Sequence, residues 1–341
     1  MKQSRPASAS SFHLATSEKE SLKKDEEFWF EDGNLILVAR DVQFRVYQGP
    51  LIAHSPVFKD MLSLPQPAED SVHWQRHGEP SCPTVLLSDS PEDLRHFLRV
   101  FMAGMSADAI RTGPHDPPFN EVSACVRLGH KYQVDHLVQR NMDFLRKYYT
   151  DEFDTWFPSN FVRPPSFRPV HSIAVVNLAR LTNQLGMLPT ALMDCCTLGA
   201  EIVDGLVRED GTHETLALDD LGRCFVGRTK MAQASARIAH QMFRQTVAPA
   251  CKHPSCCQRV LQRLLTALGD ARDEVISCVD WYASWMVYVD GRDEERELCI
   301  RCYKMLEGER PKRLQREVWM NLPAMMGVAV EGWGTKPKQE T

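Results

Sequence analysis

Five cysteines in the C-terminal half of the chain have the spacing of metal ligands. Cys251 and the adjacent pair Cys256 and Cys257 form one group, and Cys299-x2-Cys302 forms a second group later in the chain. Four thiolates, with either Cys256 or Cys257 taking part, would close a tetrahedral zinc site. Such a site would be structural, because four thiolates leave no open position for water or substrate. The alternative is that these thiols are core residues, since Cys302 also continues an apolar helical stripe.

Three other motifs lack the context that their chemistry requires. Residues 222–229 imitate a phosphate-binding G-x4-G-K-[ST] loop, but they follow a predicted helix instead of a strand, which indicates a helix-to-helix linker. His73 and His77 lie in a proline-bounded surface loop and lack the glutamate of zincins. The basic residues of 310–316 are surrounded by glutamates, which is typical of a solvated helix face. The sequence therefore predicts no catalytic residue, and we expect a protein that is not an enzyme.

The chain of 341 residues is 43% apolar and 25% charged, a composition typical of globular proteins, and its length favours two domains. A formal charge of -5 provides no field that would attract nucleic acid or an anionic membrane. The sequence lacks a signal peptide and a run of about 18 uncharged apolar residues, so it predicts neither secretion nor a membrane span. The eleven cysteines should then be reduced thiols or metal ligands in an intracellular protein, cytoplasmic or nuclear.

The N-terminal half combines strand and helix patterns. Residues 1–27 are polar and predict a disordered tail. Strands are predicted at 34–39, 42–47 and 84–87, with two short helices broken at Pro56 between the second strand and the third. Amphipathic helices should follow up to about residue 150. The expected core residues are Leu37, Phe44, Leu51, Phe58, Leu94, Phe97 and Leu98.

The C-terminal half shows helical periodicity nearly throughout. We expect a proline-rich, extended linker at 151–170 whose aromatic residues hold it in place, a helical domain at 171–330 and a tail at 331–341. The first domain should occupy residues 28–150. The fold class predicted from these patterns is α+β, a small sheet flanked by helices followed by a mainly helical domain.

Several segments of the first domain resemble the BTB/POZ family. They are DGNLILV at residues 32–38, FRVY at 44–47, LIAHSPVF at 51–58 and ML at 61–62. Segments 216–224, 298–302 and 319–323 resemble a large group of BTB proteins from mushroom-forming fungi. The resemblance implies a self-association face and a groove. In dimeric family members this groove is charged, whereas this chain has Asn34 and, after Tyr47, Gln48 at the matching places.

The function that the resemblance implies is a non-enzymatic protein-interaction module, acting by BTB-mediated self-association or as an adaptor or scaffold for protein partners. One alternative is a substrate adaptor of a cullin-type ubiquitin ligase, although the contact motif expected after Leu62 is replaced by SLPQPA. A second alternative is a zinc-containing transcriptional regulator that contacts DNA. A homodimer through the first domain is expected in the preferred interpretation.

Overall fold

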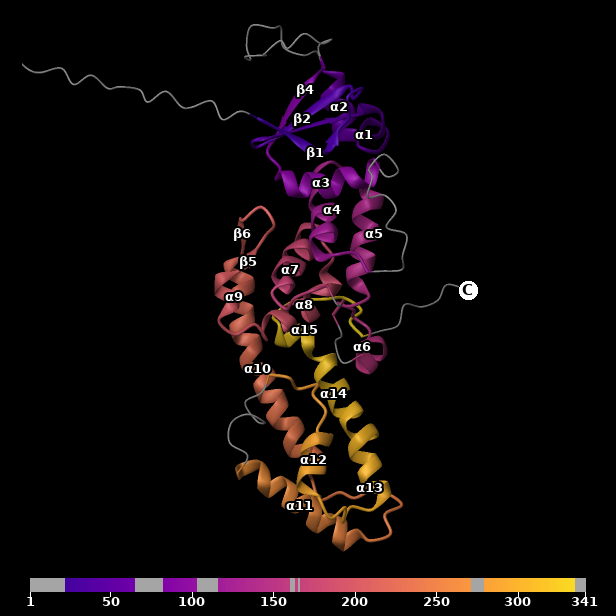
Figure 1. Cartoon of the computed structure of the whole chain (residues 1–341). Coiled ribbons are helices and arrows are strands. Elements are labelled where there is room, and N and C mark those ends of the chain that lie inside the picture. The colour runs from indigo at the N-terminus through magenta and orange to yellow at the C-terminus, as the bar shows by residue number, and fades with distance from the viewer. Residues whose placement is uncertain are drawn as a thin grey trace, which may run out of the picture.

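The computed structural model describes residues 22–64, 82–102, 116–159, 163–164, 166–270 and 279–334. The molecule is elongated, with the N-terminal sheet at one end and residues 254–270 and 300–304 at the other (Figure 1). The predicted histidine motif at 73 and 77 lies outside the described residues. The predicted C-terminal tail is described to residue 334, and Trp333 within it is buried, with its ring centroid 5.0 Å from that of Trp319. The tail prediction is therefore wrong for this part of 331–341.

The three predicted strands form one small sheet. Strands β2 (Leu35–Ala39) and β3 (Val42–Val46) pair antiparallel through a tight turn, in which Arg40 takes a φ of 52°. Strand β4 (Thr84–Leu87) pairs in parallel with the other edge of β2. Leu37 and Phe44 are opposite each other in the hairpin, and both are buried on the face that packs against helices.

A fourth strand, β1 (Lys23–Trp29), begins inside the segment that the sequence predicts as a tail. It pairs in parallel with β3 and completes the strand order β1-β3-β2-β4. The carboxylate of Asp25 accepts hydrogen bonds from the main-chain N–H groups of Glu27 and Phe28, and it also accepts one from the guanidinium of Arg95. The prediction of a tail through residue 27 is wrong because tertiary partners satisfy polar groups that would otherwise remain in water.

Five helices complete the N-terminal part: α1 (Gln48–His54), α2 (Pro56–Ser63), α3 (Pro91–Phe101), α4 (Phe119–Lys131) and α5 (Asp135–Arg146). Serine hydroxyls cap two of them, since Ser55 accepts from the N–H of Phe58 and Ser90 from that of Asp93. All seven expected core residues are fully buried, which confirms the predicted core.

The predicted linker at 151–170 contains helix α6 (Phe153–Ser159), so it is not extended throughout. Trp156 is 1% exposed, and its ring stacks on that of Trp281 at 5.3 Å. The expectation that aromatic residues pin this segment is confirmed. Helices α4 and α5 contribute side chains to both apolar clusters of the molecule, Val126 to the C-terminal one and Leu128 to the N-terminal one, for example. The two parts of the chain are therefore packed together along α4 and α5.

The described residues after 170 are mainly helical, as predicted. They form α7 (His171–Leu181), η1 (Leu185–Met187), α8 (Leu188–Cys195), α9 (Glu201–Asp204), α10 (Leu218–Met242), α11 (Pro254–Asp270), α12 (Met286–Arg292), α13 (Ile300–Lys304), the π-helical turn η2 (Met305–Glu309), α14 (Arg310–Met320) and α15 (Leu322–Met325). A short hairpin of β5 (Leu206–Val207) and β6 (His213–Glu214) was not predicted. Residues 222–229, which resemble a phosphate-binding loop in sequence, lie inside α10. The prediction of a helix-to-helix linker at these residues is therefore wrong.

None of the helices in the described ranges is both long enough and apolar enough to cross a membrane.

Candidate metal centre

Four cysteines converge at the end of the molecule opposite the sheet. Cys251 follows α10, and Cys257 lies in the first turn of α11. Cys299 immediately precedes α13, which contains Cys302. The four Sγ atoms all lie within 4.8 Å of one another. In a tetrahedral site with metal–sulfur bonds of about 2.3 Å, neighbouring sulfurs are about 3.8 Å apart, so these thiols are close enough together to bind a metal ion.

The structure distinguishes between the two adjacent cysteines that the sequence leaves as alternatives. Cys257 faces the cluster, whereas the Sγ of Cys256 lies 3.9 Å from the carbonyl oxygen of Glu297, to which it donates. Consecutive residues of a helix point about 100° apart, so one of an adjacent pair can face the cluster while the other does not. Cys299 and Cys302 point into the same cluster, and Cys302 is also part of the C-terminal apolar core. This convergence is the geometry that a shared ion requires.

The main chain donates hydrogen bonds to two of the sulfurs. The N–H of Ala248 donates to Cys302 Sγ, and the N–H of Cys299 donates to Cys257 Sγ, both at 3.4 Å. Burial raises the pKa of Cys257 to about 11. At Cys299, hydrogen bonds from the Cys302 N–H and from neighbouring thiols outweigh burial and lower the pKa to about 6. A bound cation would stabilise the thiolate forms of these cysteines and offset the repulsion between them.

Arg310 fixes the segment of chain that leads to this cluster. Its guanidinium donates to the carbonyl oxygen of Met242 at 2.5 Å, and it also donates to that of Thr246. Thr246 lies two residues before Ala248, the donor to Cys302 Sγ. The carbonyl end of α10 carries the negative end of the helix dipole, which favours a cation at this position. Arg310 thus joins the end of α10, the start of α14 and the approach to the cysteine cluster.

The sequence does not reveal this role of Arg310. It predicts that the basic residues of 310–316 form a solvated face, and Arg313 and Arg316 are indeed exposed. Arg310 is only 8% exposed, so the prediction is wrong at this residue. Burial and the nearby Arg313 lower the pKa of Arg310. The preceding π-helical turn, η2, shifts the register of the helix and is not apparent from residue spacing.

The residues expected in the groove also lie together, at the start of α1. The side-chain oxygen of Asn34 accepts a hydrogen bond from the main-chain N–H of Gln48 at 2.9 Å. The ring of Tyr47 stacks on Phe30 with centroids 5.2 Å apart, and its hydroxyl donates to Asp32. Asn34 is exposed, and Tyr47 and Gln48 are partly exposed. The carboxylate of Asp32 is a charged group at this surface that the expected set of groove residues did not include.

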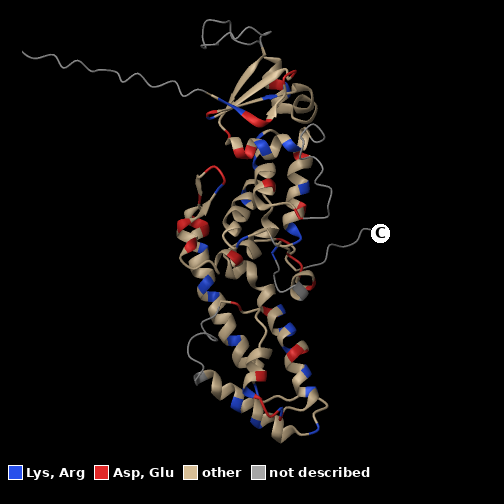
Figure 2. Ribbon diagram, in the orientation of Figure 1, with Lys and Arg blue, Asp and Glu red and all other residues tan. Residues whose placement is uncertain are grey.

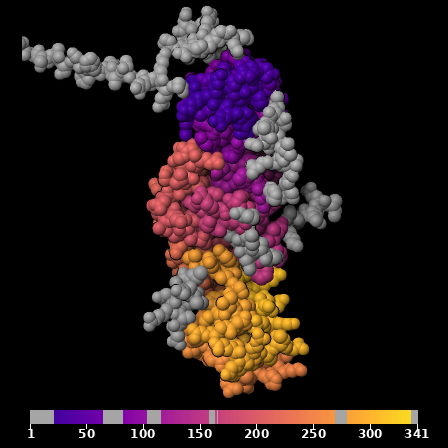
Figure 3. Space-filling model, in the orientation of Figure 1, coloured from indigo at the N-terminus to yellow at the C-terminus, as the bar shows by residue number. Residues whose placement is uncertain are grey.

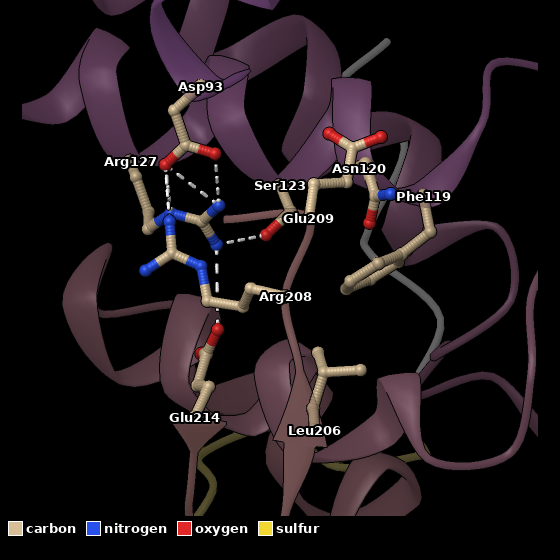
Figure 4. A pocket seen from close by; sticks show the side chains of 9 residues that line it. All are labelled: Asp93, Phe119, Asn120, Ser123, Arg127, Leu206, Arg208, Glu209 and Glu214. Atoms are coloured by element: carbon tan, nitrogen blue, oxygen red, sulfur yellow. Dashed lines mark hydrogen bonds and ion pairs between the residues drawn. The ribbon is translucent and has the colours of Figure 1, made fainter. Parts of the chain in front are cut away.

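The segment that contains the β5–β6 hairpin lies against the N-terminal part (Figure 3), and a charged cluster joins the two (Figure 4). Arg127 of α4 and Arg208 of the hairpin both pair with Asp93 of α3, and Arg127 also lies 3.6 Å from Glu214. The cavity at this cluster measures about 10 Å³, which is room for about one water molecule. Two guanidinium groups are balanced by two carboxylates, so the cluster serves as a contact between elements. Residues this far apart in the sequence carry no pattern that predicts the contact.

Comparison with family models, with curated proteins and with solved structures gives no match for this chain.

Proposed function

We propose that this protein is a non-enzymatic protein-interaction module whose N-terminal part acts as a BTB/POZ domain inside the cell. The observation that carries the proposal is the arrangement of elements. The β2–β3 hairpin is followed by the pair α1 and α2, then by β4 in parallel with β2, and then by α3, α4 and α5. This is the order of hairpin, helix pair, strand and helices in which the BTB-like motifs occur along the sequence. The surface formed by Asn34, Tyr47 and Gln48 is the proposed place of self-association or partner binding.

The distribution of charge agrees with a protein partner better than with nucleic acid. Lys and Arg are interspersed with Asp and Glu over most of the molecule in the view of Figure 2, although α10 carries only basic charges after Asp220. Several basic side chains are also paired, as Arg263 is with Asp293 and Glu297 near the cysteine cluster. Phosphate binding depends on unpaired basic groups that can displace counterions. A zinc-containing regulator that contacts DNA is therefore the less favoured of the two functions.

The proposed role of the metal centre is structural, with zinc as the ion. Cys251, Cys257, Cys299 and Cys302 supply four sulfur ligands, which suit a tetrahedral d¹⁰ ion. Zinc would join the turn after α10, the start of α11 and α13. Because four thiolates fill the coordination shell, the ion would stabilise the helical region without activating water.

Affinity capture of the full chain tests the interaction proposal. The variant Asn34→Asp/Gln48→Glu places negative charge beside Asp32, while Glu317→Lys changes an exposed residue of α14 as a control. We expect the wild type and the control to retain the same protein partners and the double variant to lose them. Identical partners for all three proteins would show that this surface does not bind them.

Metal analysis tests the zinc proposal independently. Protein purified without added zinc should contain about one zinc per chain, as a closed four-ligand site retains its ion. Cys302→Ser should lose the metal, whereas Cys256→Ser should keep it, because Cys256 faces away from the cluster. Wild-type protein with far less than one zinc per chain, or equal loss from both variants, would refute this site.

A further inference from the structure

Helix α10 has an apolar face that no described element covers. Leu218 is 84% exposed, Phe225 57% and Val226 54%. With Gly222 they stand at positions i, i+4, i+7 and i+8, which gather on one side of a helix. The opposite side of α10 is buried in the C-terminal core, so packing of this chain does not require these exposed residues to be apolar. Contiguous exposed apolar residues of this kind mark an interaction site.

A groove runs beside this face, between α10 and α15. It has a volume of about 420 Å³, and Gly222, Val226 and Met325 are among its lining residues. A Cβ added at Gly222 would meet nothing within 4 Å among the described residues, so the floor of the groove is open at this point. An apolar side chain from another molecule can therefore approach the backbone of α10 closely.

The charges on this face are complementary to those of the same face in a second copy. Asp219 and Lys230 are separated by three helical turns and differ in direction by only about 20°, so both lie on the same side of α10. If two copies of α10 pack antiparallel about the midpoint between residues 224 and 225, Asp219 of each helix faces Lys230 of the other. This centre places Val226 within one residue, about 1.5 Å along the helix axis, of the position opposite Gly222, where its side chain can fill the open floor of the groove. The ionic and apolar pairs therefore require registers that differ by only one residue, about 1.5 Å along the axis.

We propose that a second copy of this chain docks on the α10 face in this antiparallel arrangement. The contact is isologous, because the same residues serve in both copies, and it contains each complementary pair twice. It is a second interaction surface, remote from the Asn34, Tyr47 and Gln48 surface. This dimer rests on the proposed function only in that both assign the protein a role in protein–protein contacts. Its formation requires neither bound zinc nor the N-terminal surface.

Sedimentation equilibrium of the full chain tests the proposal by charge exchange. Asp219→Lys and Lys230→Asp should each weaken the dimer at least tenfold, because each places like charges opposite one another. The double variant Asp219→Lys/Lys230→Asp should restore the dimer, since the pairs re-form with the charges reversed. Glu317→Lys serves as the control and should leave the dissociation constant unchanged.

Gly222→Leu separates docking from folding. The added side chain should raise the melting temperature, because leucine favours a helix more than glycine does and the space around Gly222 is open. The same side chain should abolish the dimer by filling the groove that Val226 of the second copy enters. A monomeric wild type at 100 µM or so would overturn the proposal, and so would a dimer that is insensitive to Gly222→Leu and to both charge variants. The latter result would leave self-association through the N-terminal surface intact.

Discussion

Replacing Arg310 with methionine should destabilise the C-terminal helical region and weaken its metal site. Methionine retains the apolar part of the arginine side chain but donates no hydrogen bond. The carbonyl oxygens of Met242 and Thr246 would lose a charged donor at a position from which water is largely excluded. The turn that leads from α10 to Cys251 would then lose the side chain that holds it.

The structure sets the size of this effect. A hydrogen bond from a charged group contributes about 1.5–3 kcal/mol, and Arg310 makes two close ones to carbonyl oxygens. The loss is therefore about 3–6 kcal/mol. Methionine avoids the cost of burying a charge, which offsets part of the loss. We expect a net decrease in the free energy of unfolding of about 2–4 kcal/mol.

Urea denaturation followed by circular dichroism measures this decrease, and competition with a chromophoric chelator measures zinc affinity. Arg313→Met is the matched control, because Arg313 is exposed on the same helix. We expect zinc affinity to fall in Arg310→Met but not in Arg313→Met, since Thr246 is connected to Cys302 through the N–H of Ala248. Equal stability and equal zinc affinity in the two variants would refute the argument that Arg310 fixes this turn.

Three further predictions concern other parts of the molecule. Phe58→Ala should lower the free energy of unfolding by about 3–5 kcal/mol in calorimetry, because Phe58 is fully buried. Burial and the nearby Arg168 lower the pKa of His171 from 6.5 to about 4, so the unfolded chain binds a proton first as pH falls. Stability should therefore decline between pH 6.5 and 4, and His171→Gln should decline less over this range; equal slopes would contradict this. Self-association at the surface of Asn34 and Gln48 should depend weakly on salt in sedimentation of the Gly222→Leu variant, because both side chains are uncharged amides and Asp32 accepts a hydrogen bond from Tyr47 of its own copy; steep dissociation with added salt would indicate ionic contacts.

Much of the fold follows from local sequence patterns. The alternation at 42–46 and the proline after Ser55 predict a strand and a helix break, and both occur in the structure. The core residues Leu94, Phe97 and Leu98 are recognisable because helical spacing places them on one side. Cysteines at short spacing are likewise visible as a potential metal site, since each pair lies close together in the chain. These features depend on residues a few positions apart, whose relative directions the backbone geometry determines.

Other features depend on contacts between distant segments. The polar segment at 23–27 becomes a strand only because β3 offers an edge for pairing. Cys257 instead of Cys256 faces the cluster because α11 packs with one particular side toward α13. The buried position of Arg310 and the pairing of Arg208 with Asp93 join residues that are far apart in the sequence. Spacing alone determined the elements and the candidate ligands, whereas packing decided which side chains meet, because the orientation of each element depends on partners that its own sequence does not contain.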